Sequence, residues 1–121
     1  MHSQRLLDHF QNPRNPGELA PPAIVVDTSN PACGDMLRLS ARFEGGRVVE
    51  ARFLTRGCTA AIAASSALTE WMAGKNYGEL NALAPAVIEE AVGGLEPASK
   101  HAAILCVDAV RQLLAAAPKF V

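Results

Sequence analysis

The chain has 121 residues, of which 50% are hydrophobic and 19% are charged, and its formal net charge is −1. This length and hydrophobic content fit a single domain, residues 1–121, with an apolar core of its own. The near-neutral charge and the lack of a long apolar run argue against a nucleic-acid partner, a membrane span or a secretion signal, so we expect a cytoplasmic protein.

The first elements predicted along the chain are a short helix and a strand. Ser3 is a suitable N-cap for the helix, and the proline- and glycine-containing segment 12–17 ends it. Residues 23–27 are predicted to form a strand, and residues 30–35 are predicted to form a loop.

A hairpin follows, because residues 36–43 and 48–54 both alternate between apolar and polar side chains and a Glu-Gly-Gly-Arg turn joins them. On the second strand the predicted buried face carries Val49, Ala51 and Phe53. The arginines in or beside the hairpin are interpreted as its solvated face, with an acidic partner as the alternative: Arg38, Arg42, Arg47 and Arg52.

The remaining pattern is helical. Residues 59–73 predict a helix that ends at Gly74, and residues 77–91 predict one or two short helices interrupted near Pro85. A last helix is predicted over residues 97–117. A hairpin followed by helices indicates an α+β fold, in which a small antiparallel sheet is covered on one face by helices.

The chain has three cysteines, and an odd number in a reducing compartment favours metal or sulfur chemistry over disulfides. Cys33 lies in the segment Asn-Pro-Ala-Cys-Gly-Asp, where Asp35 offers a carboxylate two residues from the sulfur. A thiolate with a carboxylate can bind zinc or ferrous iron. The alternative is a turn that contains a half-buried cysteine.

The second cysteine, Cys58, lies between the second hairpin strand and the helix after it. A helix N-terminus stabilises a thiolate, which both metal ligation and sulfur transfer need. The alternative is a small apolar residue that closes the turn. Because Cys33 precedes the hairpin and Cys58 follows it, antiparallel pairing should bring the two sulfurs together at one edge of the sheet.

Two further candidates lie in the last helix. His101 falls in its first turns and is either a metal ligand or a histidine of the helix surface. Cys106 lies on an apolar helix face and is interpreted as a buried core thiol.

With these residues in place, the sequence resembles the IscU/NifU-type iron–sulfur cluster assembly scaffold family over nearly its whole length. Residues 8–15, Asp-His-Phe-Gln-Asn-Pro-Arg-Asn, are similar to the N-terminal signature of the family. Residues 30–35 are similar to its Pro-x-Cys-Gly-Asp loop. Residues 57–66 are similar to its Gly-Cys-x-x-Ala-Ile-Ala-x-Ser-Ser segment.

The resemblance implies a three-stranded antiparallel sheet packed against helices. It also implies a non-enzymatic scaffold that accepts sulfur from a cysteine desulfurase, binds iron or a labile [2Fe–2S] cluster, and passes the cluster to apo client proteins. Zinc could occupy the site in purified protein. By position, the ligands that the resemblance implies are Cys33, Asp35, Cys58 and His101.

The sequence departs from the family at the third ligand cysteine, whose position is Ala102. Cys106 comes one helical turn later and is only a weak substitute ligand. Sulfur would then have to be accepted by Cys58 or Cys33. The chaperone-binding Leu-Pro-Pro-Val-Lys stretch of the family reads Leu-Glu-Pro-Ala-Ser at residues 95–99, which does not favour chaperone recruitment.

Two other functions remain open at this point. A regulatory or adaptor protein could bind the desulfurase without building clusters. An enzyme with Cys58 as nucleophile and His101 as base is the weakest alternative, because the sequence shows no substrate-pocket motif.

Overall fold

The structure, a computed structural model, describes residues 2–31 and 34–117. These residues form, in chain order, α1 (Gln4–Gln11), β1 (Ile24–Asn30), β2 (Asp35–Glu44), β3 (Arg47–Arg56), α2 (Thr59–Met72), α3 (Tyr77–Asn81), α4 (Pro85–Ala91), a 3-10 turn (Pro97–Ser99) and α5 (His101–Ala116).

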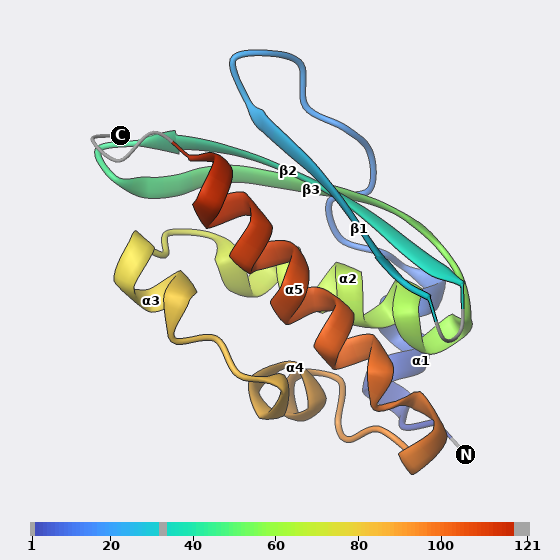
Figure 1. The fold of residues 1–121 in the computed structure, drawn as a ribbon. Coiled ribbons are helices and arrows are strands. Elements are labelled where there is room, and N and C mark those ends of the chain that lie inside the picture. Colours follow the sequence, from blue (N-terminus) through green and yellow to red (C-terminus); the bar gives the residue numbers. More distant parts are fainter. Residues whose placement is uncertain (1, 32–33, 118–121) are drawn as a thin grey trace.

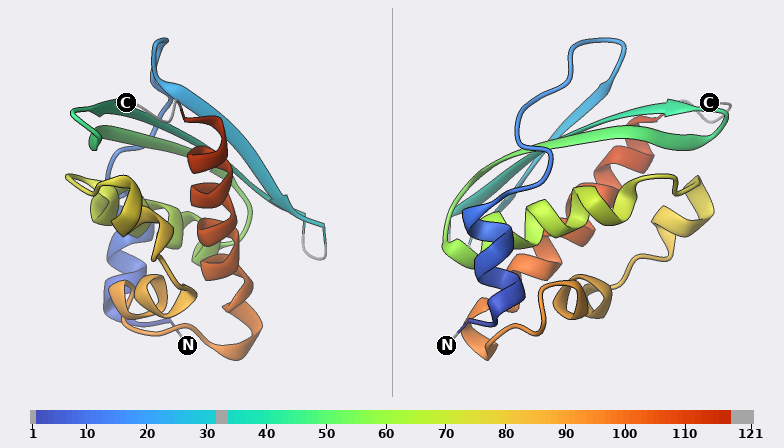
Figure 2. Two further views of the ribbon diagram at one scale, coloured as in Figure 1. Left: turned by 60° about the vertical axis from the view of Figure 1, so that its left-hand side comes forward. Right: turned by 180° about the vertical axis from the view of Figure 1, so that it is seen from behind.

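The three strands make one antiparallel sheet in the order β1-β2-β3, and the helices gather on one of its faces (Figure 1). Helix α5 packs on β1 and β2, α2 packs on β3, and α1 lies beside α2, as the view from behind in Figure 2 shows. Leu39 of the sheet, Leu68 of α2 and Leu105 of α5 are at most 2% exposed and belong to the core between these layers. The predicted α+β architecture is confirmed. In the part of the chain that the structure describes, no helix is both long enough and apolar enough to span a membrane.

The ends of the helices follow the predicted signals. The Ser3 side chain accepts a hydrogen bond from the Leu6 backbone N–H and so caps α1. Helix α2 ends at Met72, and Gly74, whose φ of +80° favours glycine, follows its C-cap residue Ala73. Two short helices, α3 and α4, occupy residues 77–91 as predicted, with Pro85 at the first position of α4.

Several predicted boundaries shift. Strand β1 continues to Asn30 and β2 begins at Asp35, because these two residues still pair across the sheet, so the predicted loop is shorter. Pro97 begins a 3-10 turn, and α5 itself starts only at His101.

A β-bulge corrects the predicted face of β3. Arg42 pairs with Glu50 while its neighbour Phe43 pairs with Val48, so Val49 is an extra residue on β3. Val48 is consequently 1% exposed, whereas Val49 is 45% exposed. The prediction that Val49 shares the buried face with Ala51 and Phe53 was wrong, because the bulge breaks the alternation on which it depended.

The outer edge of β3 is hydrogen-bonded by two other segments of the chain. Phe53 donates its N–H to the Asn15 carbonyl at 3.0 Å and accepts from the Gly17 N–H at 2.8 Å. Val48 donates to the Lys75 carbonyl and accepts from the Gly74 N–H, both at 2.9 Å. The segment after α1 and the loop after α2 therefore cover this edge.

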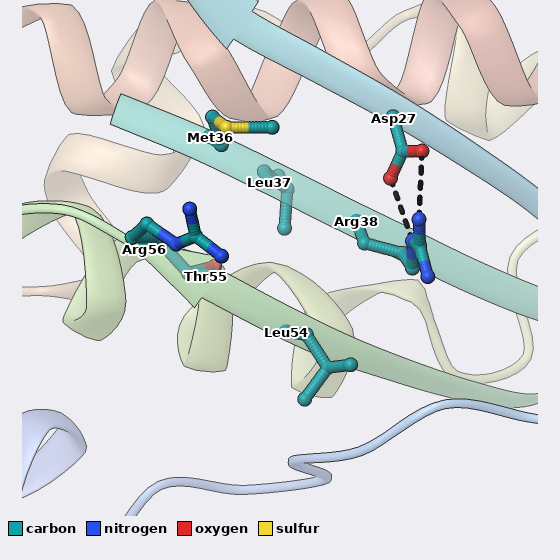
Figure 3. Close-up of a pocket in the computed structure, with 7 residues that line it drawn as sticks. All are labelled: Asp27, Met36, Leu37, Arg38, Leu54, Thr55 and Arg56. Atoms are coloured by element: carbon teal, nitrogen blue, oxygen red, sulfur yellow. Dashed lines mark hydrogen bonds and ion pairs between the residues drawn. The ribbon is translucent and has the colours of Figure 1, made fainter. Parts of the chain in front are cut away.

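The sheet face opposite the helices carries charged pairs and a shallow pocket of about 370 Å³ (Figure 3). Two of the residues that line it form an ion pair: Arg38 donates to both carboxylate oxygens of Asp27, at 2.7 and 3.0 Å. The other hairpin arginines also have acidic neighbours: Arg42 with Glu44 and Glu50, Arg47 with Glu79, and Arg52 with Glu50. This pairing supports the interpretation of these arginines as a solvated face.

Candidate functional site

The candidate site is built from residues at the starts of three elements, which meet at one end of the molecule (lower right in Figure 1). Asp35 is the first residue of β2, Cys58 is the N-cap of α2, and His101 is the first residue of α5. The hairpin register pairs Met36 of β2 with Arg56 of β3. Asp35, directly before Met36, and Cys58, two residues after Arg56, therefore lie at the same edge.

The functional atoms of these side chains converge. His101 Nε2 lies 3.1 Å from Asp35 Oδ2, and Cys58 Sγ lies 3.6 Å from the same oxygen. Cys58 Sγ and His101 Nε2 are 3.9 Å apart. The Asp35 side chain is 6% exposed and that of His101 is 27% exposed, while Cys58 is exposed. The group is thus buried on its carboxylate side and open on its thiol side.

These separations are within a few tenths of an ångström of those between ligands around one metal ion. A tetrahedral ion with bonds of about 2.0 to 2.3 Å holds neighbouring ligand atoms about 3.3 to 3.8 Å apart. Sulfur, imidazole nitrogen and carboxylate oxygen are all donors that zinc and iron accept. Cys58 makes no side-chain cap hydrogen bond to α2, so helix capping does not occupy its sulfur.

The same distances argue against a nucleophile relay. In a Ser-His-Asp type of triad the nucleophile and the carboxylate contact opposite nitrogens of the imidazole. Here both the thiol of Cys58 and the carboxylate of Asp35 face Nε2 of His101. The three atoms point at a common position rather than forming a chain for proton transfer.

The other predicted or discussed residues do not belong to this group in the part of the chain that the structure describes. Cys33 lies outside the described residues. Cys106 is fully buried in the core, and this burial raises the pKa of its thiol to about 12. Ala102, at the position of the third family cysteine, is also fully buried.

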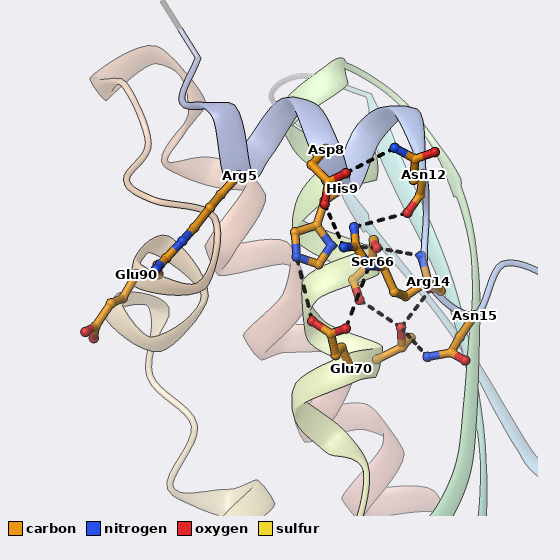
Figure 4. A network of polar contacts seen from close by, with 10 residues as sticks. Arg5, Asp8, His9, Asn12, Arg14, Asn15, Ser66, Glu70 and Glu90 are labelled. Atoms are coloured by element: carbon orange, nitrogen blue, oxygen red, sulfur yellow. Dashed lines mark hydrogen bonds and ion pairs between the residues drawn. The ribbon is translucent and has the colours of Figure 1, made fainter.

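A second polar network, between α1 and α2, was missed from the sequence (Figure 4). His9 Nδ1 lies 2.8 Å from Ser66 Oγ, which also accepts the Arg14 backbone N–H at 2.8 Å. Glu70 lies on the other side of the ring, with Oε1 3.8 Å from His9 Nε2. His9 and Ser66 belong to the motifs that carried the resemblance, so the motifs marked both residues without indicating that they meet.

Comparisons with known proteins agree with the geometry. The family model described as the NifU-like N-terminal domain matches residues 1–119. The chain is 38% identical over 114 residues to the iron–sulfur cluster assembly scaffold protein IscU 1 of Archaeoglobus fulgidus, covering 94% of this chain and 74% of the relative. It is 38% identical over 118 residues to the scaffold protein IscU of Haemophilus influenzae, covering 94% and 93% of the two chains.

Solved structures share the fold. A putative scaffold protein for the SUF system from Fervidobacterium islandicum superposes with a TM-score of 0.77 at 20% identity, covering 93% of this chain and 96% of the other. A NifU-like N-terminal protein from Brucella abortus gives a TM-score of 0.69 at 21% identity, with 95% of each chain covered. At these identities the likeness concerns the fold alone.

Proposed function

The chain belongs to the NifU-like N-terminal domain family, and from this membership we propose that it is an iron–sulfur cluster assembly scaffold. It binds iron or a labile [2Fe–2S] cluster at the end of the sheet where β2, α2 and α5 begin. A cysteine desulfurase supplies the sulfur, and apo client proteins receive the cluster.

The observation that carries this proposal is the spacing of Asp35, Cys58 and His101, whose ligand atoms lie 3.1 to 3.9 Å apart. The metal is cargo, and these three side chains provide one donor each. Cys33 is proposed as the fourth donor, because it lies two residues before Asp35 in the sequence. Two thiolates, a carboxylate and an imidazole complete a four-coordinate set, and mixed ligation of cluster irons has precedent.

Cys58 is the proposed sulfur acceptor, because it is the one exposed thiol among the described residues. Its thiolate attacks the outer sulfur of a persulfide on the desulfurase. The sulfur–sulfur bond of the donor breaks, its thiolate leaves, and Cys58 carries the persulfide, so no external oxidant or reductant is needed.

Anaerobic reconstitution with ferrous iron and sulfide tests the proposal. The wild type should bind iron and acid-labile sulfide with visible absorption, and Cys58→Ala should lose both. Cys106→Ala is the matched control, because its thiol is buried in the core away from the site and it should keep both. A wild type that stays colourless and retains no metal would refute the scaffold function.

A regulatory or adaptor role is the second candidate, and Ala102 in place of the third ligand cysteine favours it. Such a protein would bind a desulfurase without assembling a cluster. Capture of the desulfurase by a Cys33→Ala/Cys58→Ala variant, together with a wild type that fails reconstitution, would select this role.

A further inference from the structure

Gly57 lies directly against the carboxylate of Asp35. A Cβ placed on Gly57 would lie 2.5 Å from Asp35 Oδ1, 2.7 Å from Cγ and 3.1 Å from Cβ. Carbon atoms in proteins pack at about 3.5 to 4.0 Å, so a methyl group here overlaps the carboxylate and crowds the base of the side chain. The Asp35 side chain thus lies in the space that a side chain at position 57 would fill.

The backbone of Gly57 does not itself require glycine. Seven other glycines of the chain have positive φ, but Gly57 is not among them. A glycine outside the left-handed region is replaceable by alanine unless the methyl group meets a neighbour. At this position the neighbour is a metal-ligand candidate, so space for Asp35 is what demands glycine.

We propose that Gly57 is a positioning residue for the metal site: its missing side chain leaves the space through which Asp35, from the adjacent strand, reaches Cys58 and His101. For Gly17, Gly78 and Gly93, the nearest atoms to a built Cβ belong to other residues than Asp35. In Gly57→Ala the Asp35 side chain must rotate away, which breaks its contact of 3.1 Å with His101 Nε2. The claim about metal binding rests on the proposed function, whereas the claim that Gly57 makes room for the Asp35 side chain does not.

Cobalt binding to purified protein tests the role of Gly57, because tetrahedral Co²⁺ absorbs visibly and stands in for zinc or iron. Gly57→Ala should weaken Co²⁺ binding by at least about tenfold, to the level of Asp35→Ala. Adding Gly57→Ala to Asp35→Ala should weaken binding far less than Gly57→Ala does alone, because the clashing carboxylate is absent and only the contact of 3.1 Å with the Cβ at position 35 remains.

Gly78→Ala is the matched control. Gly78 also lies outside the left-handed region, and its built Cβ would meet only Asn76 Oδ1 at an ordinary 3.5 Å. This variant should bind Co²⁺ like the wild type. Wild-type affinity in Gly57→Ala would overturn the proposal. Additive losses in the double variant would also overturn it, because they would show that Gly57 serves the turn rather than Asp35.

A metal-free measurement separates this inference from the proposed function. If the wild type binds no Co²⁺, zinc or iron, the scaffold function fails while the steric claim remains testable. A crystal structure of metal-free Gly57→Ala should then show Asp35 turned away from His101 with the strands and helices unchanged. An intact contact between Asp35 Oδ2 and His101 Nε2 in that variant would refute the positioning role.

Discussion

Two histidine clusters involve helix α2, one along its length at Ser66 and Glu70 and one at its N-cap, Cys58. Each combines an imidazole with a carboxylate and a thiol or hydroxyl. In the first, Ser66 contacts one nitrogen of His9 and Glu70 approaches the other. In the second, Cys58 and Asp35 both face the same nitrogen of His101.

Burial separates the two clusters as well. His9 is 6% exposed and Ser66 is fully buried, so no external molecule reaches their contact. Cys58 is exposed and makes no capping bond. Partners on opposite ring nitrogens hold two helices together, whereas partners that converge on one nitrogen next to an open thiol leave a place for an ion. The comparison therefore predicts that the His9 cluster supports stability and the His101 cluster supports binding.

The strongest test of this comparison replaces each histidine with alanine in a separate variant, His101→Ala and His9→Ala. His101→Ala removes one of the four proposed donors, so Zn²⁺ affinity should fall at least about 100-fold, or about 2.7 kcal/mol. His9→Ala should leave the affinity unchanged once the protein is folded. Isothermal titration calorimetry on both variants measures the difference. Equal Zn²⁺ affinities for the wild type and His101→Ala would remove the distinction between the clusters.

Ser66→Ala should produce the largest loss of stability, about 2 kcal/mol in the free energy of unfolding. It leaves the Arg14 backbone N–H and His9 Nδ1 without the hydroxyl that both contact in a buried position. Urea denaturation measures the loss, with Zn²⁺ affinity measured alongside. A loss of metal binding without a loss of stability would reverse the assigned roles.

The pH dependence of stability gives a smaller test of the same cluster. Burial, helped by the charge of Arg14, lowers the pKa of His9 below 6.5, although Glu70 and Asp8 oppose the shift. The folded protein therefore takes up this proton less readily than the unfolded chain. The contribution is fully present above the unfolded pKa of about 6.5 and is lost as the pH falls through the lower pKa of the folded state.

His9→Asn keeps a polar group near Ser66 but cannot titrate. Urea unfolding between about pH 7.5 and about pH 5.5 should show a weaker dependence on pH in this variant than in the wild type. Identical slopes in the two proteins would exclude His9 as the source of the acid sensitivity.

The smallest effect is expected for Arg38→Ala, which measures how much an exposed ion pair contributes to the free energy of unfolding. Arg38 and Asp27 have side chains that are 45% and 53% exposed, so water already screens their attraction. The loss in the free energy of unfolding should be close to the error of the same urea titration, because exposed ion pairs contribute little. A loss as large as that of Ser66→Ala would mean that the outer sheet face contributes as much as the helix contact.

The sequence predicted those parts of the fold that depend on near neighbours. Hairpin pairing is local, so the strand ends alone predicted that the segment before β2 and the segment after β3 meet at one edge. The contact described there joins Asp35 and Cys58, whereas the predicted meeting of Cys33 with Cys58 stays a prediction. The bulge at Val49 escaped prediction, because Val48 and Val49 are both apolar and either could belong to the buried face.

Contacts between distant segments could not be predicted either. His9 and Ser66 are 57 positions apart, and only the packing of α1 on α2 brings them together. The role of Gly57 was hidden for a similar reason. A glycine before a helix is an ordinary turn residue in a sequence, and the need for space appears only when the Asp35 side chain is seen to fill it.

The covered edge of β3 has a consequence for how the protein behaves in solution. An open strand edge is a template for pairing with another chain, and such pairing leads to aggregation. Here the backbone groups of Phe53 and Val48 already bond to the segment after α1 and to the loop after α2. The contact between His9 and Ser66 anchors α1, so it also keeps that segment on the edge. Weakening this contact would cost solubility in addition to stability.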